Sequence, residues 1–422
     1  MLKQYAYKFQ LKSNIHQAKK MAQFAGCNRL IWNKALALQK ERPETDKKIY
    51  KYTELAEMLV EWKKEQNFLN ETHSQTYQQT LKSLDRALSE AFNKNNPKKF
   101  PVFKKKGLKD SFKYPQGCKL EEKDSRIYLP KLGWVCYRKS RSVEGEVKNV
   151  TVSKNCGKWY VSIQVEVEIE QPKHSSKSMV GIDVGIAKFA TISNGEIIEG
   201  LNTFRKYEKR LAFLQRKLSR KQKFSNNWKK LKVKISRLHA KIANIRKDFL
   251  HKATDKISKN HAVVVMEDLK VSNMSKSASG TIENKGKKVK AKSGLNKAIL
   301  DQGWYEFRRQ LEYKLKWRGG YLVLVSPKYT SQKCSECGHT ESENRTSQVK
   351  FECKNCGHSE NADVNASKNI LAAGLAVFAC GGYDISQPLK QELTVSRVQK
   401  KFCAWSESPC FSQGRMSKYI YQ

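Results

Sequence analysis

The sequence predicts an α/β fold combined with a β-barrel-like unit. Two observations support this fold class. Apolar and polar residues alternate over 126–138 and 147–168, which is typical of strands with one buried face. From Met179 onward, short apolar segments alternate with helical patterns, as in a sheet covered by helices. The chain has 422 residues, and at roughly 150 residues per domain this suggests two or three domains.

The N-terminal half combines the barrel-like unit with a helical segment. Residues 5–11 alternate like a short strand, and Asn14 is placed to cap a long helix. Two further helical patterns follow, over 53–64 and 72–94. A segment rich in proline and lysine, 95–109, then leads into the strands, where Asn155-Cys-Gly-Lys predicts a hairpin turn. We therefore expect a β-barrel interrupted by a helical insertion.

The second half opens with a β-meander over 180–198, turning at Asn194-Gly195. Residues 204–260 are helical and carry 20 lysines and arginines against three acidic residues, a net charge of +17. Their apolar stripes favour two paired helices with a turn at 225–227 and a cationic outer face; a lone coiled coil is the alternative.

The remaining elements alternate between strands and helices. A Ser/Gly/Lys-rich segment among them is either a lid or a mobile loop. In order, we expect a strand over 262–267, this segment over 272–295, a helix over 296–317, a strand over 321–325 and a helix over 362–376.

The charge of the chain indicates the class of its partner. The chain has 82 lysines and arginines against 40 acidic residues, a formal net charge of +42. Such self-repulsion points to a polyanion, DNA or RNA. A hydrophobic content of 39% argues against a basic disordered tail. The N-terminus lacks a secretory signal pattern, and the apolar run 371–380 is too short to cross a bilayer, so we expect a soluble protein with no membrane partner.

Four cysteines predict a metal site. Cys334 and Cys337 are followed, after fifteen residues, by Cys353 and Cys356. This is zinc-ribbon spacing, in which two tight turns present four thiolates tetrahedrally. Because four thiolates saturate zinc, the predicted site is structural. One alternative is that His339 or His358, each of which follows a glycine, replaces a cysteine as a zinc ligand. The other is that the four thiols bind no metal.

Three carboxylates stand at the ends of predicted elements. Asp183 lies in an apolar strand, Glu267 ends another, and Asp363 begins a helix. Each has an ordinary explanation: a turn residue, a solvated strand end and a helix N-cap. The order of the elements, however, is that of an RNase H-like domain, which brings three such acids to one sheet edge. There they can hold two Mg²⁺ ions about 4 Å apart for phosphodiester hydrolysis. Asp268 is the weaker candidate, because adjacent strand residues face opposite sides.

Several segments resemble, in order and spacing, the TnpB family encoded by insertion sequences. These segments are 181–191, 265–269, 331–338 and 361–370, together with 5–9 and 28–34 near the start of the chain. The resemblance implies an RNA-guided DNA endonuclease related to type V CRISPR effectors. It implies a RuvC-type nuclease domain with an inserted zinc ribbon, preceded by a wedge-like β-barrel with a helical recognition insertion.

The resemblance also assigns roles to residues. Asp183, Glu267 and Asp363 are the implied catalytic, magnesium-binding residues, and the four cysteines are the implied zinc ligands. The implied domains are a wedge-like β-barrel over 1–13 and 96–175, a helical recognition insertion over 14–95, a RuvC-type nuclease domain over 176–330 and 360–380, a zinc ribbon over 331–359, and a disordered tail over 381–422.

The implied partners are a guide RNA from the element's own locus and double-stranded target DNA, in the cytoplasm and nucleoid of a prokaryotic cell. Base pairing with the guide supplies sequence specificity while basic side chains bind phosphates. Gln75 and Gln79 are candidates for reading a DNA motif beside the target. Candidates for binding phosphates are Arg205, Lys209, Arg216, Lys217, Arg220 and Lys221. For both groups, a solvated helix face is the alternative.

Two other functions stay open at this point. One is a guide-independent RuvC-like nuclease, and the other is a non-catalytic nucleic-acid-binding regulator of transposition. The intact set of three acids favours an enzyme over the regulator. The sequence leaves the oligomeric state open.

Overall fold

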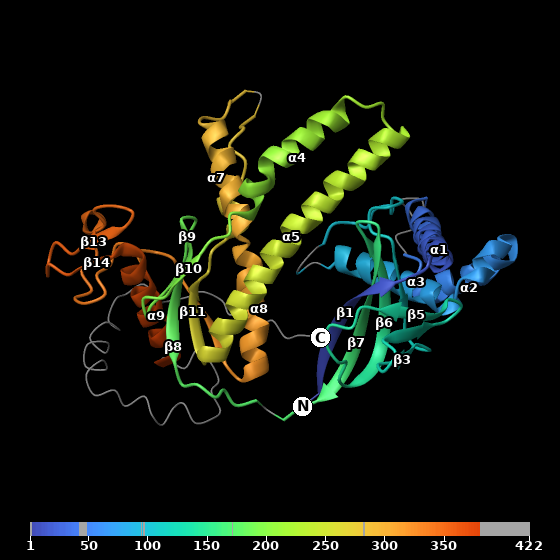
Figure 1. The fold of residues 1–422 in the computed structure, drawn as a ribbon, viewed down its shortest axis with the longest axis horizontal. Coiled ribbons are helices and arrows are strands. Elements are labelled where there is room, and N and C mark those ends of the chain that lie inside the picture. The colour runs from blue at the N-terminus through green and yellow to red at the C-terminus, as the bar shows by residue number, and fades with distance from the viewer. Residues whose placement is uncertain are drawn as a thin grey trace. The chain divides into compact units, whose positions relative to one another are not determined.

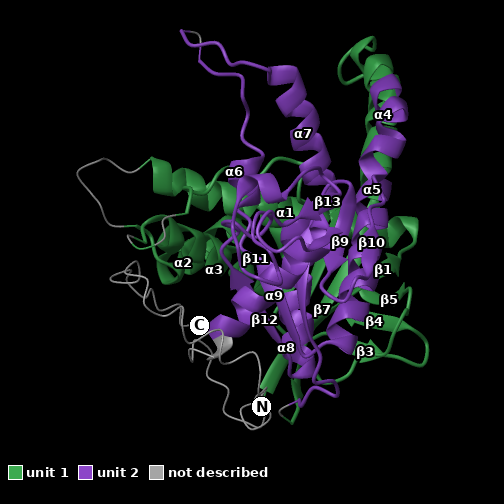
Figure 2. Ribbon diagram, turned by 90° about the vertical axis from the view of Figure 1, so that its left-hand side faces the viewer, with its two compact units in different colours: residues 1–171, 214–240 green, residues 172–213, 241–422 purple. Residues whose placement is uncertain are grey.

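The computed structural model describes residues 2–41, 49–93, 95, 98–170, 172–281 and 283–379. The tail predicted over 381–422 lies outside the described residues. The chain divides into two compact units (Figure 2). Unit 1 comprises Met1–Gln171 and Leu214–Ala240, and unit 2 comprises Pro172–Phe213 and Lys241–Gln422.

Unit 1 contains a seven-stranded antiparallel sheet in the order β2-β6-β7-β1-β5-β4-β3. Its strands are β1 (Leu2–Lys12), β2 (Ser111–Tyr114), β3 (Lys119–Glu121), β4 (Arg126–Leu129), β5 (Gly133–Tyr137), β6 (Glu146–Asn155) and β7 (Lys158–Glu168). The predicted hairpin turn joins β6 to β7 with Cys156 and Gly157 at φ +49° and +83°. The strands β2 and β3 are the outer strands of this order, so closure into a barrel stays a prediction.

The helices of unit 1 follow the sequence pattern closely. They are α1 (Ile15–Lys40), α2 (Tyr52–Glu65), the 3-10 helix η1 (Asn67–Glu71) and α3 (Ser74–Ala91). Asn14 caps α1 as predicted: its Oδ1 accepts from the N–H of Gln17 at 2.7 Å, and the Gln17 side chain accepts from the N–H of Asn14 at 3.1 Å. These helices share an apolar core that includes Ile31, Leu55 and Tyr77.

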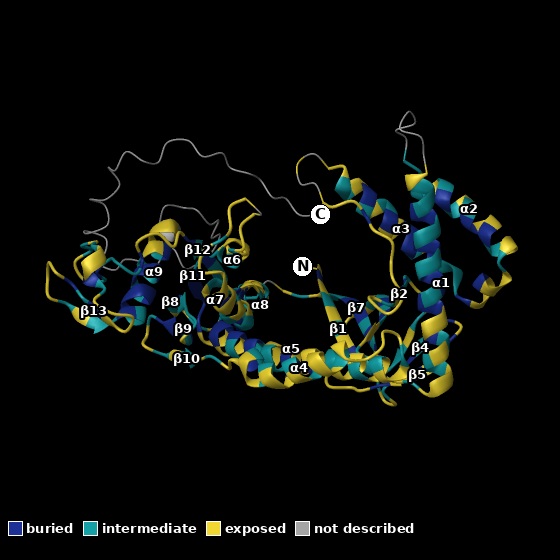
Figure 3. Ribbon diagram, turned by 90° about the horizontal axis from the view of Figure 1, so that it is seen from above, coloured by how far each residue is buried: buried dark blue, intermediate teal, exposed yellow. Residues whose placement is uncertain are grey.

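The two predicted basic helices are present as α4 (Thr203–Ser219) and α5 (Asn226–Asn260), and their packing against each other stays a prediction. Most residues of the two helices are exposed (Figure 3). The turn lies slightly earlier than predicted, because Asn226 is already helical. Ser225 caps the helix, its Oγ accepting from the N–H of Trp228 at 3.2 Å.

Unit 2 is built on a five-stranded sheet in the order β10-β9-β8-β11-β12 (Figure 1). Its strands are β8 (Met179–Val184), β9 (Lys188–Ile192), β10 (Ile197–Glu199), β11 (Val263–Glu267) and β12 (Tyr321–Val325). The neighbours β8, β11 and β12 are parallel, whereas β8, β9 and β10 pair antiparallel. The structure thus contains the mixed α/β architecture that the sequence predicted.

Both faces of this sheet are covered by helices. Val264 and Met266 of β11 pack in one cluster with residues of α5 and of α8 (Trp304–Arg318). Val263 and Val265, on the opposite face, pack with Ile370 of α9 (Ala362–Ala379). Burial on both faces explains why this strand is apolar throughout instead of alternating.

Two expectations about 272–317 were wrong. The single helix predicted over 296–317 is two helices, α7 (Val289–Gln302) and α8, separated by Gly303 at φ +75°. Glycine adopts this left-handed conformation without penalty and ends α7, although the apolar stripe continues across it. The segment 272–295 is not wholly a loop, because α6 (Val271–Met274) and the first turns of α7 fall in it. None of the described helices combines the length and apolar content that crossing a bilayer requires.

Candidate active site and metal centre

Asp183 and Glu267 lie beside each other on neighbouring parallel strands. The register of β8 and β11 pairs Ile182 with Met266. The next step of the same register sets Glu267 beside Asp183. Because parallel strands end at the same edge of a sheet, both carboxylates stand at the carboxyl edge, where ligands bind in open α/β sheets.

The third carboxylate reaches this edge because α9 lies very close to the sheet. A Cβ atom on Gly181 of β8 would come within 2.1 Å of the carbonyl oxygen of Ser367, and a Cβ on Gly374 within 2.4 Å of Val265 Cγ2. Only glycine fits at either contact. The two glycines therefore set the distance between the helix that carries Asp363 and the strand that carries Asp183.

Asp363 is not the N-cap of its helix. Asn361 has that role, its Oδ1 accepting from the backbone N–H of Asp363 at 3.1 Å and of Val364 at 3.3 Å. The Asp363 carboxylate is thus left available for other contacts. Asp363 Oδ1 lies 3.6 Å from Nη2 of Arg345, and both side chains are partly buried.

The charges of the three acids act on one another. Burial, together with the negative charges of Glu267 and Asp363, raises the pKa of Asp183 to about 7; Arg345 and the N–H of Val184 act in the opposite direction. Burial also raises the pKa of Glu267, opposed by the Thr330 hydroxyl, which donates to Glu267 Oε1 at 2.6 Å. An excess of partly buried negative charge is an environment that favours binding a cation.

The three acids fit Mg²⁺ by donor type, since this ion prefers carboxylate oxygens. The raised pKa of Asp183 further indicates that the protein alone does not neutralise the negative charge of the three acids. Within the described residues, only the four cysteines bring three or more candidate ligand atoms within 4.8 Å of one another. The carboxylate oxygens are therefore more widely spaced than the thiolates.

The sequence did not mark Arg345 and Thr330 as site residues. Both come from the segment between β12 and α9, and they meet the acids only through its folding, so local sequence carries no signal for them. Asp268 is occupied elsewhere: its Oδ1 lies 2.5 Å from Nη1 of Arg308 on α8. This agrees with its expected position on the opposite side of the strand.

The four cysteines form one compact cluster. The Sγ atoms of Cys334 and Cys356 are 3.7 Å apart, and those of Cys337 and Cys353 are 3.6 Å apart. With Zn–S bonds of about 2.3 Å, the edge of a tetrahedron is about 3.8 Å. The thiolates therefore fit a tetrahedral zinc ion.

Two matched turns build this cluster. The N–H of Cys334 donates to the carbonyl oxygen of His339 at 2.8 Å, and the N–H of Cys353 donates to that of His358, also at 2.8 Å. Gly338 and Gly357 have φ of +78° and +71°, which explains the glycine in each turn. Neither histidine belongs to the cluster of candidate ligands. The turns lie beside β13 (Lys350–Glu352) and β14 (Ser359–Asn361).

The residues predicted to contact nucleic acid lie on α3, on α4 and directly after α4. Gln75 and Gln79 are one turn apart on α3 and both are half-buried; Gln75 Oε1 is buried and accepts no hydrogen bond from the described part of the chain. The six predicted phosphate contacts are all exposed. Four lie on α4 and two directly after it: Arg205, Lys209, Arg216, Lys217, Arg220 and Lys221.

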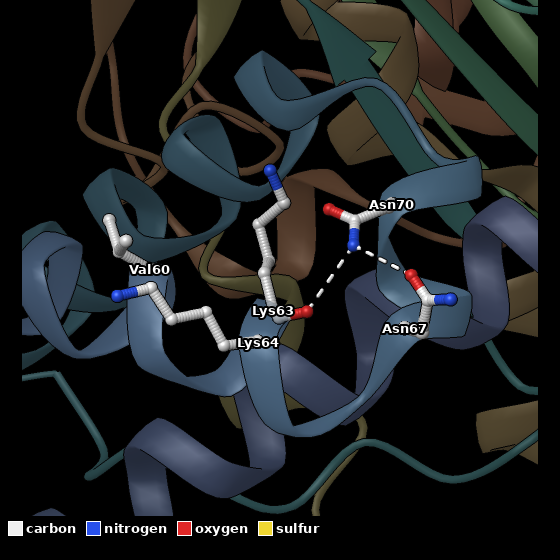
Figure 4. Close-up of a pocket in the computed structure, with 5 residues that line it drawn as sticks. All are labelled: Val60, Lys63, Lys64, Asn67 and Asn70. Atoms are coloured by element: carbon white, nitrogen blue, oxygen red, sulfur yellow. Dashed lines mark hydrogen bonds between the residues drawn. The ribbon is translucent and has the colours of Figure 1, made fainter.

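A surface cavity of about 450 Å³ lies in unit 1, where α2 leads into η1 (Figure 4). It is lined by Val60, Lys63, Lys64, Asn67 and Asn70. The Asn70 amide donates to the carbonyl oxygen of Lys63 at 3.3 Å and to Asn67 Oδ1 at 3.1 Å. Its lining holds no carboxylate and none of the residues that the sequence marked as functional.

Family models match three parts of the chain. Residues 162–278 match a model described as "Probable transposase", residues 304–370 match "Cas12f1-like, TNB domain", and residues 1–48 match "Helix-turn-helix domain". The described residues of the last match form one strand and one long helix, β1 and α1.

Two curated relatives span nearly the whole chain. The first, from Escherichia coli (strain K12) and named "Putative RNA-guided DNA endonuclease InsQ", is 58% identical over 392 residues, covering 92% of this chain and 97% of the relative. The second, from Streptomyces pristinaespiralis and named "Putative RNA-guided DNA endonuclease", is 36% identical over 404 residues, covering 94% of this chain and 95% of the relative. A solved Cas12f1-sgRNA-target DNA complex aligns with a TM-score of 0.32 at 18% identity, covering 87% of this chain and 99% of that chain.

The transposase model and the two full-length relatives place the chain in a transposon-encoded class of protein. Within that class, the chain belongs to the TnpB family.

Proposed function

We propose that this protein is an RNA-guided DNA endonuclease of a mobile element. The observation that carries the proposal is the cluster of Asp183, Glu267 and Asp363, in which burial and the charges of the other two acids raise the pKa of Asp183. Full-length relatives with names that state this activity add independent support. In this reading, the guide RNA is transcribed from the element's own locus and pairs with the target strand of duplex DNA beside a short DNA motif.

We place the hydrolysis of the phosphodiester bond at these three acids. Mg²⁺, when bound there, would activate water and stabilise the charge of the leaving oxygen, by a two-metal scheme. Glu267 is held by the Thr330 hydroxyl and Asp363 by its position in the first turn of α9. The Arg345 guanidinium, next to Asp363, is placed to attract a phosphate oxygen.

The domain assignment belongs to the same proposal. The order β10-β9-β8-β11-β12, with α9 against the sheet, supports an RNase H-like, RuvC-type domain with the zinc ribbon inserted before α9. The antiparallel sheet of unit 1 supports a wedge-like barrel with α1 to α3 as a recognition insertion. The zinc ion is structural, because four thiolates leave it no open position. We expect the protein to act in the cytoplasm, at the nucleoid.

Cleavage of a labelled DNA duplex tests the proposal. The purified protein is incubated with Mg²⁺, with and without RNA transcribed from sequence flanking the gene, on duplexes that carry a target matching that RNA. We expect cutting only when RNA and matching target are both present. Cutting without RNA would identify a guide-independent nuclease. No cutting with any guide would favour a non-catalytic regulator of transposition.

Asp183→Asn tests the catalytic role of the carboxylate, because the substitution removes one negative charge while keeping the size of the side chain. This variant should bind the RNA and fail to cut. Retained cutting would show that the catalytic carboxylates lie elsewhere.

A further inference from the structure

The basic segment between α3 and β2, residues 98–109, is not explained by the proposed chemistry. It contains six lysines and no acidic residue. We call it the Pro/Lys strap. Its only ion pair within the described residues joins Lys98 to Glu90 at 2.9 Å, so most of its charge is not neutralised by the protein.

The strap has no regular secondary structure, yet α1 holds its backbone in place. Trp32 Nε1 donates to the carbonyl oxygen of Val102 at 3.2 Å. Asn33 pairs with the backbone of Lys104 in both directions, accepting from its N–H at 2.8 Å and donating to its carbonyl oxygen at 3.1 Å. The side-chain amide of Asn33 and the indole of the buried Trp32 thus replace hydrogen bonds that a helix or strand would supply.

The far end of the strap is fixed as well. Asp110 Oδ1 accepts from the N–H of Gly107 at 3.1 Å and lies 3.0 Å from Nη1 of Arg29, again on α1. The strap is therefore an anchored surface feature, and its side chains are presented from a defined backbone.

This backbone presents aromatic rings between cations. Phe100 and Phe103 are 42% and 44% exposed. Lys40 Nζ lies 4.6 Å from the centre of the Phe103 ring. Lys105, Lys106 and Lys109 are exposed and have no acidic partner among the described residues. Exposed aromatic rings beside cations without acidic partners form a surface that suits an anionic partner with flat, apolar faces.

Lys104 differs from its neighbours. Its ammonium lies 3.6 Å from the centre of the Trp32 ring, and burial of that ammonium lowers the pKa of Lys104 to about 8. The residue as a whole is nevertheless exposed. Lys104 therefore helps to anchor the strap, and the outward-facing cations are the lysines that follow it.

Rings interleaved with cations fit unpaired nucleotides. Lysines bind the phosphates, and an aromatic face stacks on a base that is not already stacked in a duplex. Duplex DNA would use the lysines and leave the rings exposed, because its bases are already stacked, and an acidic protein segment would also need only the lysines. Under the proposed function, the guide RNA is the partner with unpaired bases before any DNA is opened.

We propose that the Pro/Lys strap binds an unpaired segment of the guide RNA, with Lys105, Lys106 and Lys109 on phosphates and the ring of Phe103 on a base. This rests on the proposed function and names a binding surface for its RNA. The partner is recognised by single-strandedness and charge, not by sequence.

Equilibrium binding tests this inference with RNA that co-purifies with the wild-type chain, sequenced and transcribed anew. The triple variant Lys105→Ala, Lys106→Ala, Lys109→Ala should lower the slope of log affinity against log salt by about 2, because each phosphate contact to a single strand contributes about 0.7. Phe103→Leu should weaken binding about tenfold and Phe103→Trp should not, because only the aromatic face stacks on a base.

A matched triple variant, Lys119→Ala, Lys123→Ala, Lys158→Ala, removes the same charge from exposed positions elsewhere in unit 1. It should leave the salt slope unchanged. Equal losses in both triple variants, or an unchanged slope in the strap variant, would overturn the inference. So would a strap variant that binds single-stranded or duplex DNA more weakly while binding RNA normally.

If the triple variant fails to fold, the two Phe103 variants still test the inference. Phe103 is half-exposed, so we expect these variants to fold. Binding is measured without cleavage, which separates the two proposals. A wild-type chain that binds no RNA would contradict the proposed function itself. A wild-type chain that binds RNA, with strap variants that bind it equally well, would contradict only the strap.

Discussion

Gly181→Ala offers a direct test of how the acid cluster is positioned. A Cβ at this position would lie 2.1 Å from the carbonyl oxygen of Ser367 and 2.6 Å from the backbone nitrogen of Leu371. Both atoms belong to the backbone of α9, so no side-chain rotation relieves the clash. Ordinary contact begins at 3.4 Å, and α9 must therefore move away from β8 by about 1.3 Å.

This displacement carries Asp363 away from Asp183 and Glu267. Misplacing a reacting group by about 1 Å costs on the order of 100-fold in rate, and overpacking a core costs about 1–3 kcal/mol of stability. We therefore expect RNA-guided cleavage to fall about 100-fold while RNA binding is retained. The assays are single-turnover cleavage at saturating Mg²⁺ and thermal unfolding of the same preparations.

Gly294→Ala is the matched control in the same unit. Gly294 lies within α7, and a Cβ there meets nothing within 4 Å. Alanine should stabilise that helix slightly, by about 0.5–1 kcal/mol, and leave cleavage unchanged. If Gly181→Ala cuts and unfolds like the wild type, close contact between α9 and β8 does not position the acids, and the reasoning is refuted.

Three further predictions concern the site. Burial and acidic neighbours raise the pKa of Asp183 from its ordinary 3.8 to about 7 in the folded, metal-free protein. The folded state therefore binds this proton more tightly than the unfolded state does. The free energy of unfolding should then fall as pH rises from about 4 to 7, by at most about 4 kcal/mol. Urea unfolding across this range should show that loss in the wild type and a smaller one in Asp183→Asn; identical profiles would contradict the raised pKa. Cys334→Ser should release zinc, measured by elemental analysis, and lower the unfolding temperature; a zinc-free wild type with normal stability would remove the ribbon assignment. Arg345→Ala should slow cleavage and leave zinc content unchanged, and an unaltered rate would show that its contact with Asp363 has no catalytic consequence.

How far the sequence predicts this structure depends on how local each signal is. The Asn14 cap, the Cys156-Gly157 turn and the cysteine pairs each depend on a few adjacent residues, and all are found as expected. The break at Gly303 was not predicted, because the apolar stripe that runs through this glycine indicates one continuous helix. For Asp363, the N-cap explanation was removed by Asn361 two residues earlier, which is itself a preferred capping residue.

Other parts of the site had no local signal. Gly181 and Gly374 matter because of what packs on them, and that contact joins segments far apart in the sequence. Thr330 and Arg345 likewise reach Glu267 and Asp363 only after the ribbon has folded. Such residues cannot be found by periodicity or spacing, because their partners are set by the topology of the sheet.

The position of the ribbon in the chain gives its zinc site a consequence for the acids. The ribbon is inserted between β12 and α9, and asparagines of α9 hold its first turn: Asn365 Nδ2 donates to the carbonyl oxygen of Lys333 at 2.8 Å, and Asn365 Oδ1 accepts from the N–H of Ser335 at 2.9 Å. Asn369 donates to the carbonyl oxygen of Thr330 at 3.0 Å, and Thr330 in turn holds Glu267.

These bonds link the thiolate cluster to the acid cluster through ordered groups. Zinc bound by the four thiolates would fix the ribbon, and with it Thr330 and Arg345, which contact two of the three acids. An ion with no open coordination position takes no part in the reaction directly. Zinc would instead determine where the groups around Glu267 and Asp363 stand, because outer partners orient the residues that hold a metal.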